Sequence, residues 1–347
     1  MKPDASTALM LGSPVPGHHA GRSRAQPRTV VPQQAPARAA WMDVVRGAAV
    51  LLILGFHATV FLEQYGDLVA PAWVVDVNTV MTPLRIPLLT LLSGMLLDGS
   101  LRKGRRRYFE GKLRNVAWPY LVWVVLWGAA SWPVYSVVGF ALGGSYMWFL
   151  LYLFSFYCLA WVLRRVPPEL VVAVALAASA LAPEGSVDAE RWPSLFAVFM
   201  AGQLLVVRPV VREWLFGSRW AWPVAALLLA LHLGLSLGYD YGTGSTLFTA
   251  AGAIALVRLS RRCAASRVLR PLRFVGRSSL VYYVAHYPLM AAVAVAASTA
   301  GVSTAAVLLP TLVVLALAAS TALACLKHAR PVRWLFSAPG TTRSVHR

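Results

Sequence analysis

Charged residues and cysteines are both scarce in this chain. Charged residues make up 13% of its 347 residues, whereas ordinary globular domains have about a quarter, so the shortage excludes an ordinary soluble composition. Two of the three cysteines lie in apolar runs and one in a basic segment, which implies no disulfide framework. Also missing are a Walker-type glycine loop, a His-Glu-x-x-His motif, cysteines at metal-binding spacing and a Gly-x-Ser-x-Gly elbow. We therefore expect no bound metal.

Apolar sequence is abundant instead. Hydrophobic residues account for 58% of the chain and the mean hydropathy is +0.63. The length would suit two soluble domains, but runs such as 44–62 and 121–130 favour a membrane. A net charge of +19 is also typical of nucleic-acid-binding proteins. Here, however, Lys and Arg interrupt the apolar runs and indicate membrane topology rather than a nucleic-acid partner.

From residue 41 onward the chain contains ten candidate spans, most of them near the roughly 20 apolar residues that a bilayer requires. Backbone groups in lipid must bond internally, and the alternation of a β-barrel is absent, so each span is expected to be a helix. Residues 1–40 predict a disordered cytoplasmic tail, not a secretory signal. We expect a transmembrane domain over 41–328 and a cytoplasmic tail over 329–347. The spans are 41–62, 73–97, 115–138, 146–163, 169–183, 192–207, 220–238, 243–257, 274–298 and 302–326.

The distribution of charge tests this topology. If the N-terminus is cytoplasmic, alternate loops should carry the Lys and Arg residues, and the segments on that side hold 28 of the 32. The opposite loops hold acids such as Glu63, Asp188 and Asp240, with Arg191 as their one basic residue. The sequence thus predicts an all-α polytopic membrane bundle of about ten helices with both termini cytoplasmic.

The first span carries polar residues that a bilayer should reject. Arg46 and His57 are eleven residues apart, which at about 100° per residue places them on one helix face, about 16 Å apart along the axis. Asp43 lies one turn before Arg46 and can pair with it. An interfacial ion pair and a satisfied core histidine would explain the same residues, but their alignment within a membrane span favours function.

Further polar residues lie in the second and ninth spans. Arg85, between Pro83 and Pro87 and followed by Ser93, predicts a broken helix that lines a polar cavity; a structural Arg bonded to freed carbonyls is the alternative. His286 lies well inside the ninth span, with Tyr282 one turn earlier. That histidine could also be structural and bond to a neighbouring helix.

Two more features have ordinary explanations. The basic segment 99–114 indicates orientation and attraction to anionic lipid, although it could also attract a polyanionic cytosolic ligand. His232 has no polar companions and is interpreted as structural, while Tyr146, Trp148 and Phe149 could form an aromatic belt.

Taken in order, these pieces resemble the type 3 acyltransferases, the integral-membrane O-acyltransferases of bacteria. The opening helix has Asp43-x-x-Arg46-Gly47 followed by His57, and the second has Arg85-x-Pro87 leading to Ser93-Gly94. The other similar segments are Tyr108-Phe-x-x-Lys112-Leu-Arg114, Met147-Trp148-Phe149-Leu150, Gly276-Arg277-Ser278-Ser279-Leu280-x-Tyr282 and His286-x-Pro288. The resemblance covers essentially all of residues 41–326.

The resemblance implies transfer of an acyl group, usually acetyl, from cytoplasmic acyl-CoA to a hydroxyl of a glycan, a lipid-linked sugar or a small natural product. It implies acyl-CoA as co-substrate, no permanently bound cofactor, and a place in the bacterial inner membrane. His57 and Arg46 match the family's essential pair and, with Asp43, are the candidate catalytic residues. The candidate donor- or substrate-binding residues are Arg85, Ser93, Tyr282 and His286.

Chemically, His57 would deprotonate the acceptor hydroxyl or carry the acyl group itself. Arg46 and Arg85 would hold the donor or offset the oxyanion charge, and Asp43 would orient or neutralise Arg46. A transporter or flippase of an amphipathic small molecule would also need helices and a polar mid-membrane site. A membrane scaffold would give these residues no purpose.

Overall fold

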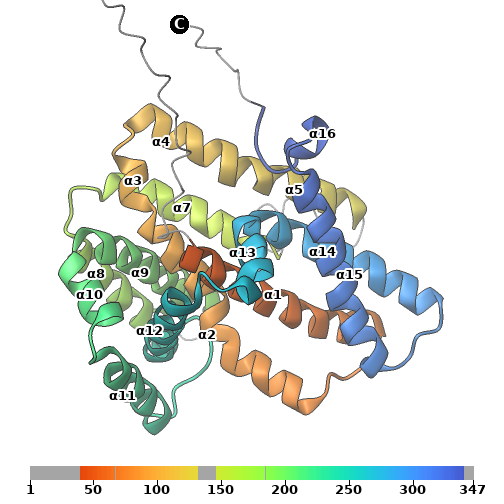
Figure 1. Cartoon of the computed structure of the whole chain (residues 1–347), viewed down its shortest axis with the longest axis horizontal. Coiled ribbons are helices and arrows are strands. Elements are labelled where there is room, and N and C mark those ends of the chain that lie inside the picture. The colour runs from red at the N-terminus through yellow and green to blue at the C-terminus, as the bar shows by residue number, and fades with distance from the viewer. Residues whose placement is uncertain (1–39, 67, 132–145, 184, 340–347) are drawn as a thin grey trace, which may run out of the picture. The chain divides into compact units, whose positions relative to one another are not determined.

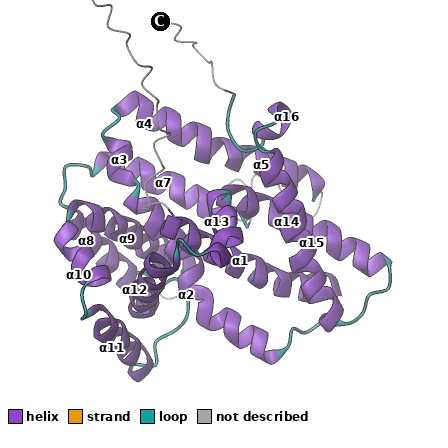
Figure 2. Ribbon diagram, viewed as in Figure 1, coloured by secondary structure: helices purple, strands orange, loops and turns teal. Residues whose placement is uncertain are grey.

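The computed structural model describes residues 40–66, 68–131, 146–183 and 185–339. All regular secondary structure in these ranges is helical (Figure 2), which confirms the all-α prediction for this part of the chain. Most of the predicted N-terminal tail and the end of the third span, from residue 132, lie outside it. The helices, labelled as in Figure 1, are α1 (Ala40–Gly66), α2 (Ala72–Met95), α3 (Leu97–Leu101), α4 (Arg105–Lys112), a π-helical turn (Leu113–Ala117), α5 (Trp118–Ala130), α7 (Trp148–Val162), α8 (Pro168–Ala180), α9 (Val187–Val207), α10 (Pro209–Gly217), α11 (Ala221–Gly234), α12 (Thr246–Cys263), α13 (Arg270–Arg277), α14 (Ser279–Thr299), α15 (Ala305–Leu326) and α16 (Arg330–Arg333).

Each of the ten predicted spans contains one of these helices. Helices α1, α2, α14 and α15 are long and apolar enough to cross a membrane. Helices α9 and α10 together form a further candidate, bent by 104°, because the residue before a proline, here Arg208, disfavours the helical conformation. The structure supports a multi-pass helical membrane protein, and the number of ten crossings stays a prediction.

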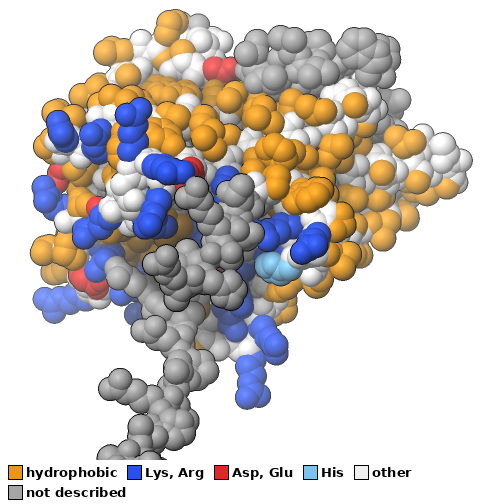
Figure 3. Space-filling model, turned by 90° about the horizontal axis from the view of Figure 1, so that it is seen from above, with side chains coloured by type: hydrophobic (Ala, Val, Ile, Leu, Met, Phe, Trp, Pro, Cys, Tyr) orange, Lys and Arg blue, Asp and Glu red, His pale blue; other side chains and the backbone are white. Residues whose placement is uncertain are grey.

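The outer surface of the bundle is suited to lipid. Large apolar side chains such as Leu121, Val125, Val162 and Val314 are exposed, which soluble proteins avoid over wide areas. Figure 3 shows hydrophobic side chains over much of one face, with Lys and Arg gathered towards one end of it. This asymmetry is the pattern that a membrane protein with one basic side presents.

Helix α1 is the central element, packed against α2, α12, α13, α14 and α15 (Figure 1). Its crossing with α13 is close because glycine stands at the contact. A Cβ atom at Gly276 would overlap the backbone carbonyl of Asp43, and one at Gly47 would overlap that of Leu272. Small residues allow this approach in membrane bundles, and here it brings α13 into backbone contact with α1.

The predicted break in α2 is wrong, because the helix runs without interruption through both prolines. Pro87 has no N–H and leaves the carbonyl of Pro83 without its helical partner. The hydroxyl of Thr249 in α12 donates to that carbonyl at 2.9 Å, so a neighbouring helix satisfies the freed group. Arg85 therefore keeps a helical position and is only 3% exposed.

The basic segment 99–114, predicted as a loop, is largely helical. Helices α3 and α4 are joined by a turn at Gly104, whose φ of 81° is readily adopted by glycine. The side chain of Tyr108 anchors α4 by donating to the carbonyl of Tyr157 at 2.8 Å.

The predicted C-terminal tail also has structure over its first part. The indole N–H groups of Trp118 and Trp123 donate to the carbonyls of Trp334 and Leu335 at 2.7 and 3.0 Å. The carbonyl of Ala338 also accepts a bond from Arg114, so the predicted tail is attached to the bundle as far as this residue. The segment that contains Trp334 and Leu335 thus packs on α5.

Candidate functional site

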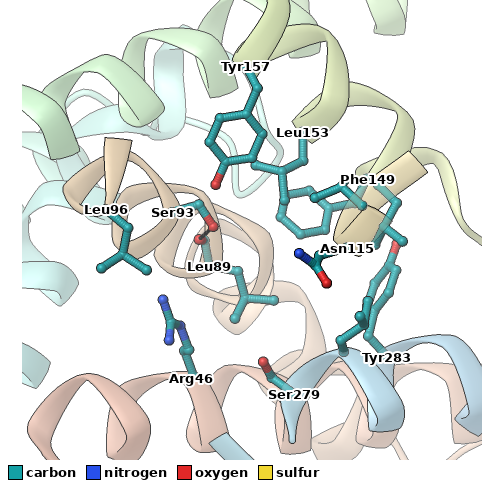
Figure 4. A pocket seen from close by; sticks show the side chains of 13 residues that line it. Arg46, Leu89, Ser93, Leu96, Asn115, Phe149, Leu153, Tyr157, Ser279 and Tyr283 are labelled. Atoms are coloured by element: carbon teal, nitrogen blue, oxygen red, sulfur yellow. Dashed lines mark hydrogen bonds between the residues drawn. The ribbon is translucent and has the colours of Figure 1, made fainter. Parts of the chain in front are cut away.

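A pocket lies near the N-terminal end of α1, between α1, α2, α7 and α14 (Figure 4). Arg46 points into it from α1 and is the one charged residue among the described residues that line it. We call it the inner pocket, because this end of α1 is predicted to face the cytoplasm. It is lined by Arg46, Leu89, Ser93, Leu96, Asn115, Val116, Phe149, Leu150, Leu153, Tyr157, Ser279, Leu280 and Tyr283.

A second pocket, the outer pocket, lies further along α1. His57 and Arg85 line it together, as predicted for a polar cavity beside the second helix. The full lining is Ile53, Phe56, His57, Thr82, Arg85, Ile86, Tyr146, Trp148, Arg191, Tyr241 and Tyr283. Because α1 is unbroken, Arg46 and His57 are about 16 Å apart along its axis, which is why they serve different pockets.

Tyr283 of α14 lines both pockets. Its ring is buried and its hydroxyl donates to the backbone carbonyl of Tyr146 at 2.8 Å. Tyr146 in turn donates its hydroxyl to the carbonyl of Val284 at 2.7 Å. These bonds hold the Tyr283 ring in place where it lines both pockets.

The two predicted histidines meet in space, although they are 229 residues apart in the chain. Nδ1 of His286 lies 3.0 Å from the carbonyl oxygen of Tyr282, and a carbonyl only accepts, so this nitrogen carries the hydrogen. Nε2 of a neutral His286 is then an acceptor. It lies 3.1 Å from Nδ1 of His57, which therefore donates to it.

This arrangement fixes the tautomer of His57. Its Nδ1 is also 3.1 Å from the carbonyl oxygen of Ile53, so two acceptors hold the hydrogen on that nitrogen. Nε2 is left with its lone pair and bonds to none of the residues that the structure describes. The half-buried ring of His57 lies in the outer pocket, so it presents a basic nitrogen beside that cavity.

Aromatic rings surround this histidine pair. Tyr287 meets His57 edge-on with ring centroids 5.3 Å apart, and it stacks on Tyr146 with centroids 4.5 Å apart. Phe56 lies on another side, with its ring centroid 5.1 Å from that of His57. Such walls limit water around the imidazole and strengthen electrostatic interactions inside the site.

The guanidinium of Arg85 has one nitrogen with hydrogen-bond partners and two without any among the described residues. Its Nη2 donates to the carbonyl of Asn78 at 2.8 Å and also contacts the hydroxyl of Thr82. Its guanidinium carbon lies 4.2 Å from the ring centroid of Phe56. The remaining nitrogens, Nε and Nη1, are buried with no hydrogen-bond partner among the described residues.

Asp43 and Arg46 interact through their charges, but the direct contact of Asp43 is with another arginine. Asp43 forms its ion pair with Arg277 of α13, with 3.5 Å between Oδ2 and Nε. Residues three apart on a helix differ in direction by about 60°, which lets Arg46 face the inner pocket while Asp43 faces α13. Asp43 therefore holds the α1–α13 contact, while its charge still acts on the nearby guanidinium of Arg46.

Comparison with known families decides what these pockets belong to. Residues 39–328 match the family model of an acyltransferase domain. The chain belongs to this acyltransferase family. The resemblance to the type 3 acyltransferases is thereby confirmed, and the protein is a membrane O-acyltransferase. No curated protein and no solved structure shows significant similarity to it.

The remaining predicted residues of the acyltransferase differ in whether they line a pocket. Ser93 lines the inner pocket. The side chain of Tyr282 points away from both pockets, since its hydroxyl bonds to that of Thr321 in α15 at 2.7 Å. Only its carbonyl belongs to the site, as the acceptor from His286. His232 is buried against Tyr239 and Phe248 and lines neither pocket.

Sequence reasoning missed several lining residues of the acyltransferase. Tyr283 lies in a run of apolar and aromatic residues, and nothing in that run indicates that its side chain lines two pockets. Tyr241 lies outside every predicted span. Arg191 did carry a signal, because it is the one basic residue that breaks the predicted charge pattern of the outer loops. That exception could have identified it.

Proposed function

We propose that this acyltransferase moves an acyl group, with acetyl as the simplest case, from cytoplasmic acyl-CoA to an acceptor hydroxyl. The donor would enter the inner pocket and the acceptor the outer pocket. The acceptor classes are a glycan, a lipid-linked sugar or a small natural product. The observation that carries the proposal is the state of His57, which lines the outer pocket: its Nδ1 is committed to hydrogen bonds, and its Nε2 bonds to none of the described residues.

The donor side of the proposal rests on charge. The α3–α4 segment is rich in Lys and Arg and would attract the phosphates of CoA. Arg46 is the charge within the inner pocket. Because it lies about 16 Å along the helix from His57, it would hold the donor and not the reacting carbonyl. The thioester would then lie near Tyr283.

The transfer itself needs one base. Nε2 of His57 takes the proton of the acceptor hydroxyl as its oxygen attacks the thioester carbon, and the carbon–sulfur bond then breaks. The proton passes from the imidazolium to the CoA thiolate, so the products are an ester and free CoA. His286 accepts the hydrogen bond of Nδ1–H throughout and keeps Nε2 facing the substrate. Base catalysis of this kind contributes about 10²–10⁴-fold.

A second route uses the same geometry. Nε2 of His57 would attack the thioester first and carry the acyl group to the acceptor. The two routes differ in one observable, because only the second leaves label on the protein when the acceptor is withheld.

We also propose that the enzyme lies in the bacterial inner membrane with both termini cytoplasmic, and that it needs no metal or resident cofactor. The exposed Cys263 lies at the end of α12, on the side predicted to be cytoplasmic. A membrane-impermeant maleimide should label it in inverted vesicles and not in intact cells. Labelling in intact cells would overturn the orientation.

The test of the activity compares wild type with His57→Ala in proteoliposomes supplied with labelled acetyl-CoA. The matched control is His328→Ala, which removes an exposed histidine outside both pockets. We expect CoA release and labelled product in wild type and in the control, and a loss of at least about a hundredfold in His57→Ala.

Equal release by wild type and His57→Ala would remove His57 from the mechanism. The acyl-CoA proposal fails if the folded wild-type protein does not bind CoA and releases none from acetyl-CoA. Transport would then be the better explanation.

A further inference from the structure

The outer pocket contains a buried positive charge with no counter-ion among the described residues. Arg85 is 3% exposed, and its neighbours supply a carbonyl, a hydroxyl and an aromatic face, but no carboxylate. Removing a guanidinium from water costs several kcal/mol unless an anion or further hydrogen bonds compensate. The unpartnered Nε and Nη1 atoms are therefore donors that await an acceptor.

A second guanidinium lines the same cavity. Arg191 of α9 lies against aromatic faces, with its Cζ atom 4.8 Å from the ring centroid of Trp148 and 5.7 Å from that of Tyr241. Its Nε is also buried without a hydrogen-bond partner among the described residues. Stacking of this kind holds the plane of the group and leaves its edge free for a ligand.

The acid that forms an ion pair with Arg191 does not line the pocket. Asp188 forms an ion pair with Arg191 at 3.6 Å, but 79% of its side chain is exposed, so water screens the pair. No aspartate or glutamate is among the described residues that line the outer pocket. Even when Asp188 is counted, the two guanidiniums leave the cavity with a positive surplus.

We propose that the outer pocket binds an anionic group of the acceptor between Arg85 and Arg191, so that the acceptor is a hydroxyl compound that carries a carboxylate or a phosphate. This rests on the proposed function in one respect, namely that the outer pocket holds the acceptor. Guanidinium groups form stronger hydrogen bonds with the charged oxygens of a carboxylate or a phosphate than with the hydroxyls of a neutral sugar. The anion would tether the acceptor while one of its hydroxyls lies at Nε2 of His57.

The proposal is tested by binding, without acyl-CoA. The full-length protein in phosphatidylcholine nanodiscs is titrated with glucuronate, glucose 6-phosphate and glucose at equal ionic strength. Wild type is compared with Arg191→Gln, Arg191→Lys and Arg85→Gln. The matched control is Arg262→Gln, which removes an exposed charge at the end of α12 that lines neither pocket.

We expect the two acidic probes to bind wild type and the control at least about tenfold more tightly than glucose, a factor that corresponds to about 1.4 kcal/mol. Arg191→Gln should lose this preference and Arg191→Lys should keep part of it. If Arg85→Gln fails to fold, the two Arg191 variants still decide. The titration with glucuronate is repeated in nanodiscs that contain phosphatidylglycerol. Weaker binding of glucuronate there would show that a lipid phosphate supplies the anion.

The absence of any preference for acidic over neutral probes in wild type, or a preference that survives in Arg191→Gln, would overturn the proposal. Release of CoA from acetyl-CoA is measured separately. An anion preference in a protein that does not use acetyl-CoA would leave the anion site standing and overturn the proposed function instead.

Discussion

The hydrogen bond between His57 and His286 joins two neutral imidazoles. In many hydrolases a carboxylate accepts the corresponding bond and stabilises the imidazolium by charge as well as by direction. Here the acceptor is Nε2 of His286, and the next acceptor is the backbone carbonyl of Tyr282. In the proposed mechanism His286 is therefore a positioning residue, which would orient His57 without adding a negative charge to the site.

Replacement of His286 should act through this single hydrogen bond. We expect His286→Leu to lower kcat by about tenfold to a hundredfold with little change in the KM for acyl-CoA, because Nδ1 of His57 then has only the Ile53 carbonyl and the ring can turn. His286→Gln should recover part of the loss, since its amide oxygen can accept the bond. Steady-state kinetics of both variants measure this. Equal losses in both would assign His286 a packing role alone.

At this scale, the sequence predicted residues that are costly in a membrane. Three of them, Arg46, His57 and Arg85, line a pocket, and His286 contacts His57. Lipid tolerates such groups only in polar surroundings. The sequence did not predict that Asp43 turns to Arg277. That choice depends on where α13 crosses α1, which the local spacing does not contain.

Close helix crossings depend on the absence of a side chain. We expect Gly276→Ala to destabilise the protein by roughly 1–3 kcal/mol, because its Cβ would overlap the Asp43 carbonyl, which is backbone and cannot move aside alone. Gly111→Ala in α4 is the matched control, since nothing lies within 4 Å of its Cβ position. Thermal melting in detergent compares them. A Gly276→Ala protein as stable as Gly111→Ala would show that α13 shifts freely.

The basic helix α4 contains a lysine with an altered proton affinity. Burial, with nearby Lys103, lowers the pKa of Lys112 from 10.5 to about 8; its Nζ lies 3.5 Å from the ring centroid of Tyr157. Between about pH 8 and about pH 10.5 the unfolded chain binds more protons than the folded one, so stability rises with pH across this window. We expect wild type to gain melting temperature relative to Lys112→Met between about pH 7 and about pH 9.5. A difference that does not change with pH would contradict the altered pKa.

Hydropathy predicted where the helices lie, but it did not predict that α2 is unbroken or that residues 99–114 are helical. Every predicted span contains a helix, since each apolar run needs internal hydrogen bonds in lipid. The break expected at Pro87 is prevented by Thr249, which is 166 residues from Pro83 in the chain. The segment 99–114 folds because Tyr108 reaches Tyr157. Both contacts join distant parts of the chain and leave no local pattern.

In the molecule as a whole, Tyr283 is the contact between two cavities that the proposed function assigns to different substrates. We expect Tyr283→Ala to connect them and raise acyl-CoA hydrolysis severalfold in the absence of acceptor, because water then reaches the thioester. Tyr283→Phe keeps the ring and loses only the bond to Tyr146, so it should remain tight. Release of CoA without acceptor measures both. Hydrolysis by Tyr283→Ala at the wild-type rate would show that another group separates the pockets.

The separation of His57 and His286 in the chain also sets an order of events during synthesis. At about 5–20 residues per second, the 229 residues between them take roughly 10–45 s to translate. Helix α1 thus emerges from the ribosome long before α14, and the imidazole of His57 lacks its partner for all of that time. A nascent or truncated chain that ends before α14 would have His57 without the hydrogen bond from which the proposed mechanism orients it. On that mechanism, the chain could become active only when the last part of the bundle joins the first.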